Sequence, residues 1–254
     1  MNLEAKLEFI RPALLNQEGI QSWFTMRNPE YCLNDARVAG FNLGMFTAEE
    51  EDILAVNMAI LSSVTKTDEL NMAITRQVHS NNIAVVDSGG LYEEVDGLVS
   101  SQSGLLLSIQ VADCAAILIG DPVHKVIGAA HAGWRGASSN VLPNLVQKMK
   151  KLGASTEHCF AYISPCIAIE SFEVGEEVAE QFPEAFVDRH SYPKPHVNLK
   201  SFLKNQLVES GMKEGQIEVD ASCTMTEKDK FYSYRRDGKN TGRMMALIKV
   251  QKTA

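Results

Sequence analysis

Residues 105–136 read LLLSIQVADCAAILIGDPVHKVIGAAHAGWRG, and this stretch decides the class of the fold. Its two apolar runs, 105–121 and 126–131, are rich in residues that form buried strands. The second run ends at His131, and Gly133 follows in a turn or helix start. Side chains at the end of a buried strand are firmly placed and accessible, so we interpret His131 as a candidate functional residue.

Strands and helices alternate irregularly on both sides of this stretch. Further strand-like runs occupy residues 20–26, 72–79, 82–87, 96–101, 161–169, 217–224 and 244–250. Apolar residues at helical spacing predict helices over 48–63, 140–152 and 173–182, and a fourth that ends at Gly211. The sequence therefore predicts an α+β fold, in which residues 1–254 form a single domain with mixed β-sheets flanked by helices.

Two of the predicted helices have recognisable starts. The helix over 48–63 follows Thr47, and Glu50 three residues later completes the pattern of a capping box. The second contains Pro143, which a helix tolerates in its first turn but not in its interior. We therefore expect that helix to begin near Asn140.

Composition excludes several classes of protein. With 254 residues, 45% of them hydrophobic, the chain is long enough to bury a large core. Its net charge of −8 argues against nucleic acid as a partner, because such proteins need excess Lys and Arg. The amino end lacks the layout of a secretory signal and no apolar run reaches the length of a membrane span, so we expect a cytoplasmic protein without a membrane partner.

The cysteines point away from disulfides. There are five, an odd number, and none forms a CxxC pair. Neither a disulfide framework nor a structural zinc finger is indicated, and we expect reduced thiols at Cys32, Cys114, Cys159, Cys166 and Cys223.

Three segments could together hold a metal ion: QVHS with His79, ADCAA with Cys114, and HAGWRG with His131. Two imidazoles and a thiolate that leave a fourth position open are typical of catalytic zinc. Each residue alone also has a plain structural interpretation: a surface histidine, an inert core thiol and a hydrogen-bonded core histidine. Asp113 precedes Cys114, and strand alternation predicts that their side chains point to opposite faces, one of which lines a site.

Other polar clusters suit an anion or a flat heterocycle. FYSYRRDG at 231–238 and TGR at 241–243 place arginines beside tyrosines, although an ordinary charged turn has the same composition. Arg135 lies at a predicted helix start and is a second candidate anion contact. The remaining histidines lie in turn-like contexts, and we interpret them as surface residues: His124, His158, His190 and His196.

In order and spacing, seven short segments resemble the bacterial laccase-domain family, whose members are labelled polyphenol oxidase or zinc-dependent purine nucleoside phosphorylase. The segments are QVHS, DGLVS, ADCAAIL, HAGWRG, SPCI, DASCT and FYSYRRDGKNTGRM, and the resemblance runs from Phe41 to Met245. It implies a mixed α/β fold with zinc held by His79, Cys114 and His131. It also implies phosphate-dependent cleavage of adenosine, inosine, guanosine and methylthioadenosine, and deamination of adenosine.

With that resemblance we assign roles as hypotheses. Cys114, His131 and Asp113 are the catalytic candidates, with Asp96 and Asp220 as other carboxylates able to move a proton. Asn42, Arg135 and Arg236 are the candidate contacts to nucleoside or phosphate: Asn42 to ribose or base, and the arginines to phosphate or base. The implied partners are purine nucleosides and phosphate, and the oligomeric state stays open.

Three alternatives remain at this point. A copper polyphenol oxidase fits the family label, but the chain lacks the several histidine pairs of a multicopper centre. A metal-free cysteine hydrolase would use Cys114 as nucleophile and His131 as base. A non-catalytic zinc-binding protein would need only the three ligands.

Overall fold

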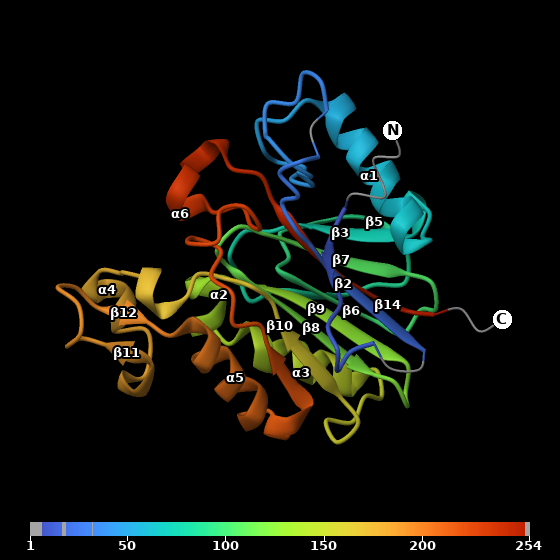
Figure 1. Cartoon of the computed structure of the whole chain (residues 1–254). Coiled ribbons are helices and arrows are strands. Elements are labelled where there is room, and N and C mark those ends of the chain that lie inside the picture. The colour runs from blue at the N-terminus through green and yellow to red at the C-terminus, as the bar shows by residue number, and fades with distance from the viewer. Residues whose placement is uncertain (1–6, 17–18, 32, 252–254) are drawn as a thin grey trace.

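Two mixed six-stranded sheets pack face to face, and helices cover their outer faces (Figure 1). The computed structural model describes residues 7–16, 19–31 and 33–251. The first sheet has the order β1 (Phe9–Ile10), β2 (Ile20–Thr25), β14 (Met244–Val250), β7 (Leu106–Val111), β3 (Met72–Arg76) and β5 (Gly90–Glu93). The second has the order β13 (Ile217–Val219), β10 (Phe160–Ile163), β8 (Ala115–Asp121), β9 (Val126–Ala132), β6 (Gly97–Ser100) and β4 (Ile83–Val85). The α+β prediction is thus confirmed.

The remaining elements are helices and one small strand pair. The α-helices are α1 (Glu51–Thr65), α2 (Trp134–Ser138), α3 (Val141–Lys151), α4 (Glu176–Ala179), α5 (Leu199–Glu209) and α6 (Tyr234–Asp237). Strands β11 (Val187–Asp188) and β12 (His196–Val197) pair with each other. Short 3-10 turns lie at Glu69–Asn71, Ile169–Ser171, Glu184–Phe186, Glu214–Gln216 and Gly238–Asn240.

Because side chains alternate along a strand, β8 contributes to the apolar core on both faces of its sheet. All seven residues of β8 are buried, as expected for a strand covered on both faces. Ala116 and Leu118 face the first sheet, whereas Ile117 and Ile119 face the apolar cluster that includes α3 and α5. The outer face of the first sheet is covered by α1 through Met58 and Leu61.

Strands β7 and β8 follow each other in sequence but lie in different sheets. The prediction treated residues 105–121 as one run with alternating faces, and that is wrong at its centre. Residues 112–114 form a bend, and Asp113 has a φ of 79°, in the left-handed region. The chain therefore crosses between the sheets at Asp113, and strand alternation does not set the direction of its side chain.

Of the two helix starts predicted from the sequence, that of α1 differs in the structure and that of α3 does not. Helix α1 begins at Glu51, and Glu50 makes no side-chain cap, while the Thr47 hydroxyl donates to the carbonyl of Gly44. The capping box is therefore wrong, because the loop before the helix uses Thr47 for its own turn. Helix α3 begins at Val141, as predicted, with Pro143 in its first turn.

Three further expectations can be compared with the structure. Cys32 lies outside the described residues, and the other cysteines are free thiols: Cys114, Cys159, Cys166 and Cys223. His196 is not a surface residue, because it is 5% exposed and its ring stacks on Tyr192. Within the described ranges, no helix has the length and apolarity needed to cross a membrane.

Candidate metal centre

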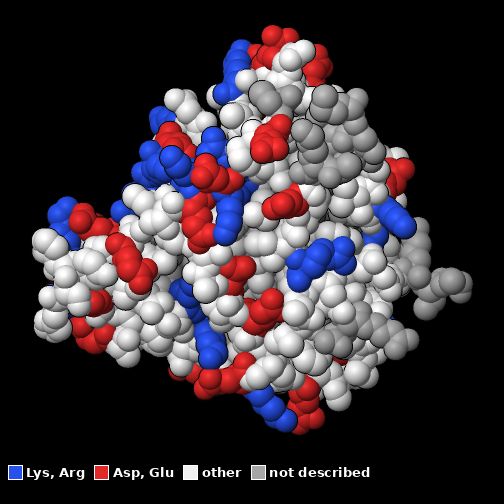
Figure 2. All heavy atoms as spheres, viewed as in Figure 1, with Lys and Arg blue, Asp and Glu red and all other residues white. Residues whose placement is uncertain are grey.

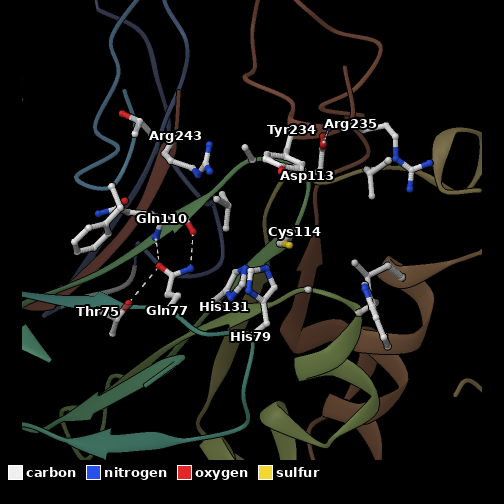
Figure 3. Close-up of a pocket in the computed structure, with 18 of the residues that line it drawn as sticks. Thr75, Gln77, His79, Gln110, Asp113, Cys114, His131, Tyr234, Arg235 and Arg243 are labelled. Atoms are coloured by element: carbon white, nitrogen blue, oxygen red, sulfur yellow. Dashed lines mark hydrogen bonds between the residues drawn. The ribbon is translucent and has the colours of Figure 1, made fainter. Parts of the chain in front are cut away.

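His79, Cys114 and His131 come together where the two sheets meet (Figure 3). His79 lies in the loop after β3, Cys114 directly before β8, and His131 near the end of β9. Their ligand atoms all lie within 4.8 Å of one another, and the two imidazole rings meet edge to face at 4.7 Å. His131 is buried, Cys114 is half-buried and His79 is exposed, so the cluster has one accessible side.

Asp96 holds both histidines in place. Its buried carboxylate accepts from Nδ1 of His131 at 2.8 Å and from the backbone N–H of Val78, His79 and Ser80. The Ser80 hydroxyl donates to it as well. Burial opposes ionisation of Asp96, but the bond from His131 and those from Ser80 outweigh it and lower its pKa to about 2. A carboxylate behind a ligand histidine fixes the ring so that the other nitrogen faces the ligand site.

Charge in the cluster favours a thiolate. Burial alone would raise the pKa of Cys114, but the positive charge of His131 lowers it well below its ordinary range. In turn burial disfavours the charged ring of His131, yet the Cys114 thiolate and Asp96 raise its pKa. A deprotonated sulfur and two neutral imidazole nitrogens form a donor set that fits zinc, and binding of the metal would release the second proton of His131. No other group of three His, Cys, Asp or Glu residues in the described part of the chain could hold an ion.

Gly133 gives the cluster room. A Cβ at this position would lie 2.7 Å from Sγ of Cys114 and 3.2 Å from Cδ2 of His79. The φ of Gly133 is −75°, which any residue can adopt. The glycine of HAGWRG is therefore required by the close approach of the ligands, not by its backbone angle.

The cluster forms part of the wall of a cavity of about 490 Å³. This volume is within the range of small-molecule sites. The polar side chains that line it include Thr75, Gln77, Gln110, Asp113, Arg235 and Arg243, and aromatic rings come from Phe46, Trp134, Phe172 and Tyr234. The cavity therefore offers cationic, amide and aromatic groups beside the three candidate metal ligands.

The three candidate substrate contacts lie outside the cavity lining. Asn42 is fully buried and accepts from the backbone N–H groups of Gly44 and Arg243. Arg135 is exposed and covers the ring of Trp134. The guanidinium of Arg236 donates to backbone carbonyls, including those of Thr224 and Phe231, and to its neighbour Asp237. All three side chains have contacts within the protein, and their role as substrate contacts stays a prediction.

Two other arginines, Arg235 and Arg243, line the cavity. Arg243 donates to the carbonyls of Thr241 and Gly242 through Nη1, and burial lowers its pKa. Arg235 donates to the carbonyl of Glu173 through Nη2. Both arginines belong to the segments that the sequence analysis identified as suited to an anion. Arg235 lines the cavity and Arg236 does not, because helix α6 turns neighbouring side chains in different directions.

The three candidate carboxylates all hold hydrogen bonds of their own. Asp113 lines the cavity and accepts from the hydroxyls of Thr224 and Ser233 and from the backbone N–H of Arg235. Asp96 is engaged behind His131 as described, and Asp220 accepts from the hydroxyl of Tyr162. Asp113 thus ties α6 to the bend between β7 and β8, which positions Tyr234 and Arg235 over the cavity.

Known proteins resemble this chain over most of its length. A protein from Deinococcus radiodurans named purine nucleoside phosphorylase is 37% identical over 215 residues, which cover 83% of this chain and 82% of that protein. Adenosine deaminase RL5, from an unknown prokaryotic organism, is 29% identical, and the match covers 96% of this chain and 97% of that protein.

The fold also has solved counterparts. The crystal structure of YlmD from Geobacillus stearothermophilus matches with a TM-score of 0.88 at 24% identity, over 96% of both chains. A family model described as multi-copper polyphenol oxidoreductase laccase matches residues 21–251, which contain all three candidate ligand residues. On that match, the chain belongs to the multi-copper polyphenol oxidoreductase laccase family.

Proposed function

We propose that this protein is a zinc-dependent purine nucleoside phosphorylase that acts on adenosine, inosine, guanosine and methylthioadenosine. The observation that carries the proposal is the cluster of His79, Cys114 and His131 in the wall of a cavity that also contains Arg235 and Arg243. The Deinococcus radiodurans relative, named purine nucleoside phosphorylase, supports it. When bound, zinc supplies Lewis acidity, which favours negative charge on a substrate oxygen.

The chain's own residues account for phosphate binding and orientation. In phosphorolysis a phosphate oxygen forms a bond to C1′ of the ribose while the C1′–N9 bond breaks and its electron pair leaves with the base. Arg243 and Arg235 place positive charge in the cavity, where guanidinium groups suit phosphate oxygens. Asp113 holds the segment that carries Tyr234 and Arg235, so we assign it a positioning role.

The test is phosphate-dependent release of base. Purified protein with zinc is incubated with inosine, with and without phosphate, and hypoxanthine and ribose 1-phosphate are measured by chromatography. We expect equal amounts of both products, formed only with phosphate, and their loss in Cys114→Ser. The matched control is Cys159→Ser, a buried thiol outside the cavity lining. Full activity of a zinc-free Cys114→Ser protein would refute the metal-dependent scheme.

A second activity, deamination of adenosine, is supported by the similarity to adenosine deaminase RL5. It needs water in place of phosphate, so it releases ammonia and inosine in phosphate-free buffer. Adenosine is the substrate that separates the two reactions, because phosphorolysis gives adenine whereas deamination gives inosine.

Asp96, His131 and Cys114 also form the chain of contacts that a cysteine hydrolase uses. Iodoacetamide separates this alternative from the metal centre. A thiolate that coordinates zinc is protected from alkylation, whereas a free nucleophile reacts whether zinc is present or not. We expect alkylation of Cys114 after chelation of the metal and protection at saturating zinc.

A further inference from the structure

Two glutamines lie side by side in the cavity wall, and only one of them is fully engaged with the protein. Gln77 uses both ends of its amide: Nε2 donates to the carbonyl of Gln110, and Oε1 accepts from the N–H of Gln110 and the hydroxyl of Thr75 (Figure 3). These bonds fix the backbone of Gln110 near the end of β7. They occupy Oε1 of Gln77, so that amide offers no free acceptor to the Gln110 side chain.

Gln110 carries an unsatisfied amide nitrogen. The residue is 7% exposed and lines the cavity, yet its Nε2 is buried without a hydrogen-bond partner among the described residues. A buried donor that lacks an acceptor destabilises the folded protein. Such a group is retained in a ligand site when the ligand supplies the missing acceptor.

The surroundings indicate which part of a nucleoside this amide meets. In Figure 3, Gln110 lies on the side of the cavity away from Arg235, with Gln77 and Thr75 beneath it. Phe46 lines the same cavity with a half-exposed ring, and the guanidinium of Arg76 packs on that ring at 4.5 Å. An aromatic surface together with a carboxamide suits a flat base, whereas the two arginines suit phosphate.

We propose that Gln110 is a specificity-determining residue whose carboxamide binds the N7 and 6-amino edge of a purine base. A glutamine amide matches this edge of adenine with two hydrogen bonds: Nε2 donates to N7, and Oε1 accepts from the amino group. A 6-oxo purine presents two acceptors at the same edge, so one of the two bonds is lost. The protein is therefore selective for 6-aminopurine nucleosides. This inference rests on the proposed function, since it names the base that the same cavity prefers.

The first test of the proposal measures how the protein's selectivity between two nucleosides depends on Gln110. The ratio of kcat/KM for adenosine to that for inosine is measured in the wild type, in Gln110→Met and in Gln102→Met, an exposed control glutamine. Differences in intrinsic reactivity between the two nucleosides cancel when the ratios are compared. We expect the ratio to fall roughly tenfold or more in Gln110→Met and to stay unchanged in the control. An unchanged ratio in Gln110→Met would overturn the proposal, whereas a merely structural role would lower both values together.

A second measurement needs neither a variant nor turnover. Binding of 7-deazaadenosine, which has C–H in place of N7, is compared by calorimetry with binding of 3-deazaadenosine, which retains N7. We expect the 7-deaza compound to bind the zinc-loaded wild type roughly tenfold more weakly. Equal affinities would overturn the role of Gln110. Because this assay reports binding alone, it also decides the inference if no nucleoside is cleaved, a result that would refute only the proposed function.

Discussion

Replacing Asp96 by asparagine tests whether one buried carboxylate assembles the metal centre. Asparagine keeps the shape but offers one oxygen acceptor where the native residue has two. If that oxygen occupies the place of Oδ1, the bonds from His131 and His79 survive, and the new NH2 group faces the N–H groups of Val78 and Ser80. Two backbone donors then lack acceptors, whereas the Ser80 hydroxyl, which also donates to Oδ2, can rotate and accept from the new NH2 group.

The magnitude follows from those two donors. Each unsatisfied buried donor costs about 1–3 kcal/mol, and because these two are only partly buried we expect a combined loss of about 2–4 kcal/mol. That is a large part of the roughly 5–15 kcal/mol by which a folded domain is stable. We also expect zinc affinity to fall by about 10- to 100-fold, as is typical when the group behind a ligand histidine is changed.

Two assays separate these effects. Chemical denaturation after treatment with a chelator gives the free energy of unfolding, and competition with a metal-binding dye gives zinc affinity. Asp87→Asn is the matched control, since Asp87 is exposed on the loop after β4. A loss in Asp96→Asn no larger than in that control, together with native zinc affinity, would refute the reasoning.

The contribution of Asp96 to the free energy of unfolding changes with pH in a predictable direction. The pKa of Asp96 is lowered in the folded protein from 3.8 to about 2, so its ionised form stabilises the fold above about pH 4. That contribution disappears as the pH falls toward 2. The difference in unfolding free energy between wild type and Asp96→Asn should therefore narrow over this interval, and a difference that widens would contradict the assignment.

Three further predictions address other parts of the structure. Gly133→Ala places a methyl group against Cys114 and His79, so zinc affinity should fall at least about tenfold. Helix content, measured by circular dichroism, should be unchanged. Gly215→Ala is the control, because open space surrounds that glycine. Lys249→Met removes a buried ammonium that donates to the carbonyls of Thr65 and Lys66 at the end of α1, so denaturation should show a loss of about 1–3 kcal/mol with native kcat. Asp113→Asn should raise KM more than it lowers kcat, because Asp113 holds α6; a fall in kcat of about 100-fold or more at native KM would instead identify it as a proton carrier.

Much of the fold could be predicted because its signals are local. The apolar runs around Cys114 and His131 specified buried strands, and Pro143 fixed the start of α3. The prediction of a capping box at Thr47 was wrong, because a threonine hydroxyl can donate to a nearby carbonyl instead of accepting from a helix N–H. The sequence contains no local signal for the sheet to which each strand belongs, and so the crossover at Asp113 was missed.

The site was predicted unevenly for a related reason. His79, Cys114 and His131 could be named because their residue types match a known donor set and their motifs occur in a known order. Gln110 carries no such signal, since glutamine is common on any surface. Arg243 belongs to a segment that the sequence identified as suited to an anion, but no local signal separates it from Arg235 and Arg236. Figure 2 shows basic and acidic side chains interspersed on the face in view, so the charge pattern does not single out one region of that face.

Two residues at the site, His79 and Asp113, have a left-handed backbone conformation. His79 and Asp113 have φ values of 60° and 79°, a region that costs a residue with a Cβ roughly 1–2 kcal/mol. Hydrogen bonds hold both: the N–H of His79 binds Asp96, and the carboxylate of Asp113 binds Ser233 and the backbone of α6. Glycine at 113 would relax the backbone but release that helix. Such a variant should therefore keep its affinity for zinc, because a relaxed backbone at residue 113 leaves the three candidate ligands in place. It should bind nucleoside more weakly, because loss of the carboxylate releases helix α6, which carries Tyr234 and Arg235.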